Sequence, residues 1–213
     1  MAKVVPAILA DDPEKLKDML HQAESYTDWV QVDIMDGKFV PSRSITCRNL
    51  LSLNINIGWE AHLMVRNPDE QFECFKNAGA QKVIFHFEAT DAPNTAIARA
   101  WELGLKIGLA VNPETPVEDV LPLADAVDSI LFLSVKPGYY GSPFIPEVLD
   151  KIREFRIACP NVEIGIDGGI KESNIRQVLA SGVDVVCVGS AITVTPQPAE
   201  SFRRLQALAN ELG

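Results

Sequence analysis

The stretch Trp29–Pro41, WVQVDIMDGKFVP, places polar side chains inside a segment that is otherwise apolar and β-branched. Gln31, Asp33 and Met35 alternate with valine and isoleucine, so the two-residue period of a strand puts all three on one face. A buried carboxylate without a partner is costly, and Asp33 therefore needs an ion pair, hydrogen bonds or a metal ion. That combination is typical of acid-base or metal chemistry, with a structural ion pair as the alternative.

A second segment, EAHLM, repeats this alternation with Glu60, His62 and Met64 on one face. Asp167 begins the run Asp-Gly-Gly, where it is either a further inward carboxylate or part of a turn. His62 and His86, each taken alone, also fit a role as hydrogen-bonded core histidines. These polar and thioether side chains nevertheless belong to several different segments. The fold must therefore bring those segments together.

The elements that would bring them together are eight short β-branched runs separated by amphipathic segments. The strands are predicted at Val4–Leu9, Trp29–Met35, Gly58–Val65, Lys82–Phe87, Lys106–Val111, Ser129–Val135, Glu163–Ile166 and Val183–Val188. Helix starts with proline after a cap residue are predicted at Asp12-Pro13, Asn67-Pro68 and Thr115-Pro116. Helix ends are predicted at Asn77-Ala78-Gly79, Glu102-Leu103-Gly104 and Ala180-Ser181-Gly182.

Eight β/α repeats with apolar strands predict an α/β protein with a parallel sheet covered by helices. The count favours a closed (β/α)8 TIM barrel over an open doubly wound sheet, and no glycine fingerprint for a dinucleotide follows the first strand. No linker interrupts the chain, so residues 1–213 are expected to form a single barrel domain.

Glycines follow the last three predicted strands. In this type of barrel such loops bind phosphate through backbone N–H groups at the carboxyl ends of the strands. The candidate phosphate-binding residues are Gly138, Gly141, Gly168, Gly169, Gly189 and Ser190. Any one of these glycines alone would also fit a simple turn.

The composition of the chain disfavours some classes of binding partner. Of the 213 residues, 47% are apolar and 23% charged, and the net charge is −10, which disfavours binding to nucleic acid. No apolar run is long enough to cross a bilayer, and the segment MAKVVPAILADD lacks an export pattern. The four scattered cysteines predict reduced packing residues in a cytoplasmic protein. They are Cys47, Cys74, Cys159 and Cys187.

Read in order, the motifs resemble the ribulose-phosphate 3-epimerases almost from end to end. The matching runs are PAIL, VDIMDGKFVP, AHLMV, HFEAT, GLAVNPETP, LSVKPGYYG, FIPEVLDKI, IDGGI and VGSAI. The resemblance implies a ribulose-phosphate-binding barrel that epimerises a ketose phosphate, a pentulose 5-phosphate or a related sugar, at C3 through an enediolate. It also implies a homo-oligomer and no organic cofactor.

The resemblance further implies roles for individual residues. Asp33 and Asp167 would exchange protons on opposite faces of the sugar, and Met35 and Met64 would lie beside the reacting carbons. Asp33, His62 and Asp167 match three ligands of a divalent metal ion, such as Zn, Mn, Mg or Fe. The fourth family ligand is a histidine, and Gln31 stands in its place. Gln31 and His62 are accordingly expected to contact the substrate region.

The chain departs from the family pattern at several positions. Ala7 replaces a serine, Leu133 replaces a methionine, and Lys38 and Lys136 are also unusual. The loop Gly138-Tyr139-Tyr140-Gly141 is bulkier than the family's loop. Two interpretations of Gln31 stay open: it serves a weaker or different metal ion, or no metal binds and it hydrogen-bonds the carboxylates or the sugar directly.

Three other functions are suggested by parts of the pattern. Related decarboxylases and hexulose-phosphate synthases carry Asp-x-Lys-x-x-Asp on a strand, whereas this chain has Asp33-Ile34-Met35-Asp36. A diverged phosphosugar-binding barrel with altered substrate or lost catalysis is favoured by Ala7 and Gln31, and opposed by the retained carboxylates. A Schiff-base aldolase would need Lys136 to be buried, although the residue precedes Pro-Gly in a loop.

Overall fold

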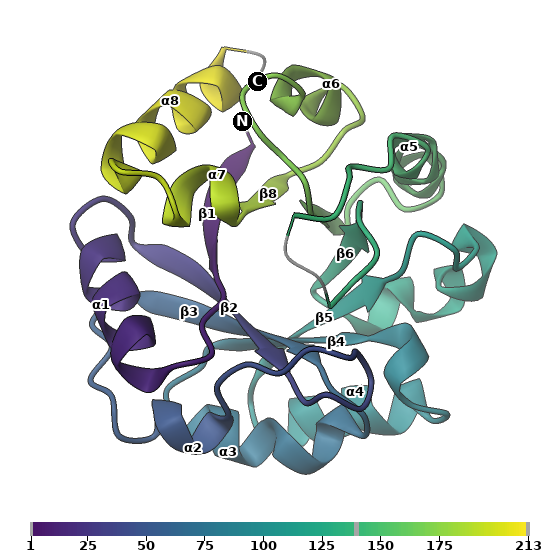
Figure 1. The fold of residues 1–213 in the computed structure, drawn as a ribbon. Coiled ribbons are helices and arrows are strands. Elements are labelled where there is room, and N and C mark those ends of the chain that lie inside the picture. The colour runs from purple at the N-terminus through teal and green to yellow at the C-terminus, as the bar shows by residue number, and fades with distance from the viewer. Residues whose placement is uncertain (1, 139–140, 212–213) are drawn as a thin grey trace.

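Eight parallel strands form a closed barrel in chain order, from β1 to β8 and back to β1, with helices as an outer ring (Figure 1). The structure is a computed structural model and describes residues 2–138 and 141–211. The strands are β1 Lys3–Ile8, β2 Trp29–Met35, β3 Gly58–Met64, β4 Lys82–His86, β5 Lys106–Val111, β6 Ser129–Leu133, β7 Glu163–Asp167 and β8 Val185–Val188. The predicted (β/α)8 TIM barrel is confirmed, and the strand ends differ by at most two residues.

The α-helices of the described residues lie between and after these strands. They are α1 Pro13–Ala23, α2 Cys47–Leu50, α3 Phe72–Asn77, α4 Pro93–Glu102, α5 Val148–Ala158, α6 Ile175–Leu179, α7 Ser190–Thr193 and α8 Pro198–Asn210. The start of α1 is as predicted, since the Asp12 side chain accepts a hydrogen bond from the backbone N–H of Lys15. No described helix combines the length and apolarity that a membrane span needs.

Two of the predicted helix starts open 3₁₀ helices instead of α-helices. The 3₁₀ helices are η1 Pro68–Gln71, η2 Phe87–Ala89, η3 Val117–Asp119 and η4 Leu121–Ala126. The start at Asn67-Pro68 leads into η1 and then α3. The start at Thr115-Pro116 leads only to η3 and η4 before β6. Pro122 explains the second case, because a proline inside a helix removes a backbone donor and clashes with the preceding turn.

The strands separate two layers of side chains. Val32 and Ile34 of β2 belong to the large core between the barrel and its helices. Gln31, Asp33 and Met35 point inward instead, and Met35 packs with Met64 of β3. The alternation predicted from the sequence is therefore confirmed for both strands, and it delivers polar side chains to the interior of the barrel.

A largely buried ion cluster lies deeper in the barrel interior. Lys82 Nζ is 3.4 Å from Glu60 Oε2 and 3.1 Å from Glu163 Oε1. Burial alone would lower the pKa of Lys82, but the two carboxylates outweigh it and raise the pKa above its usual range. This lysine stays charged, so it is unsuited to Schiff-base chemistry.

A disulfide joins Cys47 at the start of α2 to Cys74 in α3. The expectation that all four cysteines are reduced is therefore wrong for this pair, while Cys159 and Cys187 are free thiols. The two sulfurs meet because consecutive repeats place α2 and α3 side by side outside the barrel. A separation of 27 residues carries no spacing signal, so only the fold reveals the pair.

Candidate active site

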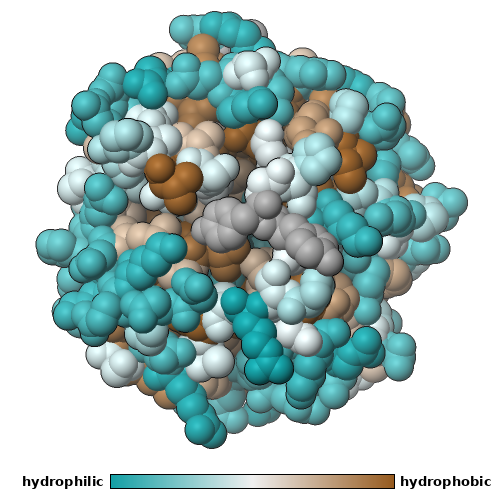
Figure 2. All heavy atoms as spheres, viewed as in Figure 1, coloured by the Kyte–Doolittle hydropathy of each residue, from teal (hydrophilic) through white to brown (hydrophobic). Residues whose placement is uncertain are grey.

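A cavity opens at the carboxyl ends of the strands. Figure 2 views the face of Figure 1, where hydrophilic side chains form the periphery and apolar atoms are visible nearer the centre. The lining combines two carboxylates and an imidazole with thioethers and glycine-rich loops. The lining residues are Ala7, Leu9, Asp33, Met35, His62, Met64, Leu133, Val135, Pro137, Gly138, Gly141, Ser142, Asp167, Gly168, Gly169, Ile170, Gly189 and Ser190.

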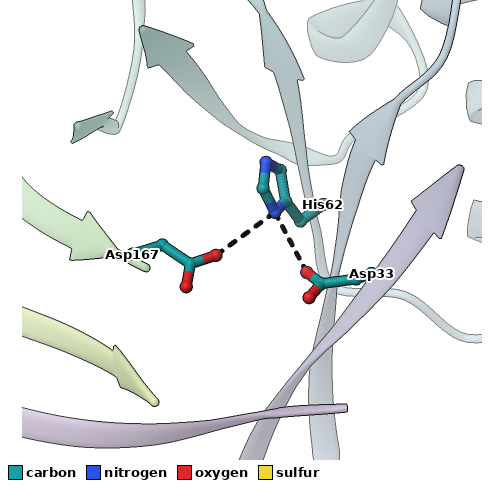
Figure 3. Close-up of side chains that lie close together, drawn as sticks. All are labelled: Asp33, His62 and Asp167. Atoms are coloured by element: carbon teal, nitrogen blue, oxygen red, sulfur yellow. Dashed lines mark hydrogen bonds and ion pairs between the residues drawn. The ribbon is translucent and has the colours of Figure 1, made fainter. Parts of the chain in front are cut away.

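Asp33, His62 and Asp167 converge on one point of this cavity (Figure 3). Asp33 and His62 are register partners on β2 and β3, whereas Asp167 comes from β7 on another side of the barrel. His62 Nδ1 lies 3.0 Å from Asp33 Oδ1 and 3.5 Å from Asp167 Oδ2. The imidazole therefore bridges two carboxylates that have no common strand.

Gln31 lies beneath these side chains and is fully buried. Its Nε2 donates hydrogen bonds to Asp33 Oδ1 and to Asp167 Oδ2, each at 2.9 Å. Its Oε1 is buried and has no hydrogen-bond partner among residues 2–138 and 141–211. Both N–H groups of the amide therefore donate to the two carboxylates and hold them together.

Burial and mutual charge set the protonation of this group. Burial raises the pKa of Asp33, the His62 hydrogen bond partly opposes it, and the charge of Asp167 adds to the increase. Burial alone would lower the pKa of His62, but hydrogen bonds to Asp167 and Asp33 outweigh it and raise the pKa to about 9. At neutral pH, and without a metal ion, His62 therefore carries a positive charge between the two aspartates.

The donor atoms also fit a divalent cation. The ligand atoms of Asp33, His62 and Asp167 all lie within 4.8 Å of one another. Bonds of about 2.1 Å put neighbouring ligand atoms about 3.0 Å apart in an octahedral site and about 3.4 Å apart in a tetrahedral one. Gln31 Nε2 is 2.9, 2.9 and 3.4 Å from the three atoms and so stands at the fourth corner. A half-turn of this amide would bring the unpartnered Oε1 to that corner as an oxygen ligand.

Behind His62 lies a second imidazole, that of His86. The sequence alone indicated only a core histidine at this position. His86 Nε2 is 3.0 Å from His62 Nε2, and His86 Nδ1 is 3.0 Å from Asn112 Oδ1. Glu88 Oε2 lies 3.6 Å from the same Nδ1. Burial raises the pKa of Glu88, but hydrogen bonds from His86, Thr115 and Asn112 outweigh it and lower the pKa. In the sequence, His86 and Glu88 could have been recognised as a pair from the spacing His-x-Glu at the end of β4.

The glycine residues expected to bind phosphate line the same cavity. Gly168 and Gly169 have φ of +113° and +66°, a backbone region that residues other than glycine rarely adopt. A Cβ on Gly168 would lie 2.5 Å from Val135 Cγ2. Gly189 and Ser190 follow β8 on the adjacent side. Tyr139 and Tyr140 lie outside the described residues.

The other lysines singled out from the sequence are not part of this arrangement. Lys38 and Lys136 are exposed, and neither lines the cavity. Ala7 and Leu133 do line it, so both departures from the family pattern concern the site itself.

Asp36, the second carboxylate of the Trp29–Pro41 stretch, serves the loop and not the cavity. Its Oδ1 accepts hydrogen bonds from the backbone N–H groups of Lys38 and Phe39, and its Oδ2 accepts one from Arg66. Burial raises the pKa of Asp36, but these three donors outweigh it and lower the pKa below its usual value. The ionised form is therefore favoured by folding.

Replacement of Asp36 by asparagine is expected to cost about 1–2 kcal/mol of unfolding free energy at pH 7, because an amide cannot accept all three bonds. Since the folded pKa is lowered, the contribution of Asp36 is present at neutral pH and lost as the pH falls through that value. The gap between wild type and variant in urea unfolding should thus shrink as the pH falls below 3.8, the ordinary pKa of an aspartate. A gap that does not change with pH would contradict this assignment.

Comparisons with known proteins agree with this architecture. Residues 3–193 match the sequence profile of the ribulose-phosphate 3 epimerase family. A ribulose-phosphate 3-epimerase of Mycobacterium tuberculosis is 38% identical over 97% of this chain and 92% of its own length. That of Escherichia coli is 35% identical over 91% of this chain and 89% of its own.

Solved structures extend the comparison to the fold alone. A 3-hexulose-6-phosphate synthase from Salmonella typhimurium has a TM-score of 0.75 at 17% identity, covering 99% of this chain and 100% of its own. KGPDC from Streptococcus mutans has a TM-score of 0.78 at 12% identity, covering 99% of this chain and 98% of its own. The profile and the full-length relatives decide the family: the chain belongs to the ribulose-phosphate 3-epimerase family and is an epimerase, an enzyme of the isomerase class.

Proposed function

We propose that this enzyme epimerises a ketose phosphate, a pentulose 5-phosphate or a close relative, at the carbon next to the ketone. Asp33 and Asp167 act as the acid-base pair. The observation that carries the proposal is the convergence of two buried carboxylates, from β2 and β7, on one cavity that also holds glycine-rich loops. Inversion at a carbon requires one proton acceptor and one donor on opposite faces, and two aspartates from separate strands supply them.

Each turnover begins with one aspartate ionised and the other protonated. The ionised carboxylate takes the proton from C3, which leaves an enediolate, and the protonated carboxyl delivers a proton to the opposite face. The raised pKa of Asp33, caused by burial and the charge of Asp167, is in the direction that favours a carboxyl able to donate a proton. The reverse reaction exchanges the two roles.

The surrounding residues stabilise and enclose the intermediate. His62 lines the cavity in which the ketone oxygen would become negative, so its positive charge stabilises the developing charge. The Gln31 amide donates to the two carboxylates and holds them in place. Met35 and Met64 pack against each other at the mouth of the cavity and exclude water from the reacting carbons. The backbone of Gly168, Gly169, Gly189 and Ser190 would bind the phosphate, with Gly138 and Gly141 opposite.

A divalent cation would be held by Asp33, His62, Asp167 and the Gln31 Oε1 after the amide has turned. When bound, such an ion supplies an electrophile that polarises the ketone. Three oxygen donors and one nitrogen suit magnesium, manganese or iron better than zinc, which favours imidazole and thiolate. In either state the protein holds both carboxylates beside one imidazole, whereas the Gln31 N–H bonds to the carboxylates exist only before the amide has turned.

Gln31→His is expected to increase the affinity for zinc relative to manganese on the order of 10- to 100-fold, because an imidazole replaces an amide oxygen at the fourth corner. Calorimetric titration of chelator-treated protein with each metal measures the ratio directly. Gln22→His, which adds a histidine at an exposed position of α1, serves as the matched control. An unchanged ratio in Gln31→His would exclude position 31 as a ligand.

The proposed function is tested by deuterium incorporation at the carbon next to the ketone, across a panel of ketose phosphates, with and without a chelator. We expect exchange and epimerisation of at least one pentulose 5-phosphate, with product formed at the rate of exchange or slower. Tight binding of a ketose phosphate without exchange would overturn the proposal in favour of a phosphosugar-binding barrel that has lost catalysis. Lys136, the candidate for a Schiff base, is exposed and lies outside the cavity lining.

A further inference from the structure

We propose that Glu88 and His86 are positioning residues that set which nitrogen of a neutral His62 carries the proton. They form a relay of polar contacts that runs from the rim of the barrel to the back of the His62 ring: His86 is hydrogen-bonded to His62, and Glu88 Oε2 lies 3.6 Å from His86 Nδ1, just beyond hydrogen-bond distance. The inference deepens the proposed function and rests on it, because His62 matters to the chemistry only if Asp33 and Asp167 carry the reaction.

The contact between the two imidazoles is the centre of the argument. His62 Nε2 and His86 Nε2 are 3.0 Å apart, and both rings are fully buried. The rings stack with centroids 5.1 Å apart and an interplanar angle of 19°. At this distance one nitrogen must carry a hydrogen and the other must accept it, since two bare nitrogens would repel and two N–H groups would clash.

The far side of His86 decides which nitrogen donates. His86 Nδ1 faces Asn112 Oδ1 at 3.0 Å and Glu88 Oε2 at 3.6 Å. The Asn112 oxygen accepts at hydrogen-bond distance, and the negative charge of Glu88 beside it favours a proton on the same nitrogen, so the proton of a neutral His86 resides on Nδ1. His86 Nε2 is then the acceptor and His62 Nε2 the donor.

His62 Nδ1 is the nitrogen that faces the carboxylates, and this order leaves it without the proton when His62 is neutral. In a neutral His62 it carries a lone pair, which a cation requires, and in the charged ring it donates to Asp33 Oδ1 at 3.0 Å. The opposite order would force a neutral His62 to carry its proton on Nδ1, and the lone pair would point away from the site. Phe39 stacks on His86 with centroids 4.9 Å apart and so restrains this ring.

Glu88 is itself held in place by two donors. The backbone N–H of Asn112 donates to Glu88 Oε1 at 2.9 Å, and the Thr115 hydroxyl donates to the same oxygen. These bonds direct the other oxygen, Oε2, towards His86. Thr115→Val therefore loosens the carboxylate without removing its charge, whereas Glu88→Gln replaces the acceptor with a group that can also donate.

The test is nitrogen NMR of protein labelled with ¹⁵N-histidine. The chain has three histidines, and one of them, His21, is exposed, so the ring signals can be assigned by single substitution. The spectra are recorded at a pH high enough for the ¹⁵N signals to show a neutral His62, because a charged His62 would impose one tautomer on His86 by itself. In the wild type we then expect His86 with Nδ1 protonated and Nε2 bare. In Glu88→Gln we expect loss of that pure tautomer, and in Thr115→Val a partial loss. Glu118→Gln, an exposed carboxylate-to-amide change in η3, is the control and should leave the spectrum unchanged.

Activity supplies the second readout. Glu88→Gln should lower kcat about 10- to 100-fold with KM changed less than about twofold, because loss of a group that orients a site histidine has effects of this size. A His86 tautomer that is identical in wild type, Glu88→Gln and Thr115→Val would overturn the relay, even if the enzyme is an epimerase. Absence of isotope exchange with every substrate would instead overturn the proposed function, while the tautomer shift would still establish the relay. If Glu88→Gln does not fold, Thr115→Val alone decides the question.

Discussion

Replacing either Asp33 or Asp167 by asparagine should reduce epimerisation by about 10³- to 10⁴-fold or more, the upper range for loss of a positioned acid-base group. Each variant retains one carboxylate and should therefore still exchange the C3 proton of one epimer with solvent. The two variants should differ in which epimer exchanges. Mass spectrometry or proton NMR of each pure epimer in deuterium oxide measures this directly.

The aspartate in the loop after β2 provides the control. Asp36→Asn makes the same chemical change three residues beyond Asp33, but its side chain caps a loop and does not line the cavity. It should keep kcat within about threefold while losing some stability. If both site variants lost exchange from the same epimer, a single base would serve both faces, and the two-aspartate scheme would fail.

Breaking the disulfide between Cys47 and Cys74 should cost roughly 3–4 kcal/mol of unfolding free energy, as expected for a cross-link that closes a loop of this length. The bridge spans 27 residues, from the start of α2 through β3 into α3. The double variant Cys47→Ser/Cys74→Ser in urea unfolding, and wild type with and without reductant, both measure the effect. Substitution and reduction should both give an unfolding free energy below that of the protein with the intact bond.

Cys159→Ser is the matched control, since Cys159 is a free thiol elsewhere on the barrel. It should leave stability unchanged and should keep the full response to reductant. Wild-type protein whose unfolding free energy is the same with and without reductant would show that the bond does not form in solution. The bond also removes one argument for a cytoplasmic location, since that expectation relied on reduced cysteines.

Sequence periodicity predicted the eight β/α repeats and the inward set, and the absence of a dinucleotide glycine fingerprint after the first strand added to the preference for a closed barrel over an open sheet. Eight apolar runs with helical segments between them leave few topologies, because parallel strands need right-handed crossovers. The two-residue period then assigns Gln31, Asp33 and Met35 to one face and Val32 and Ile34 to the other. The candidate residues Asp33, His62 and Asp167 converge in the fold because their strands end at the same rim.

The tertiary structure decided every question that depends on which side chains meet across strands. Asp36 and Asp33 are both aspartates near the end of one strand, yet only the arrangement of neighbouring loops makes Asp36 a cap. The Gln31 amide contacts both carboxylates because β7 approaches β2 across the barrel, and no local pattern contains that distance. The same holds for the disulfide and for the His86 relay. Local sequence specifies the conformation of a segment and which of its side chains face inward. Contacts between residues more than a hundred positions apart depend on barrel closure and on the register of the strands.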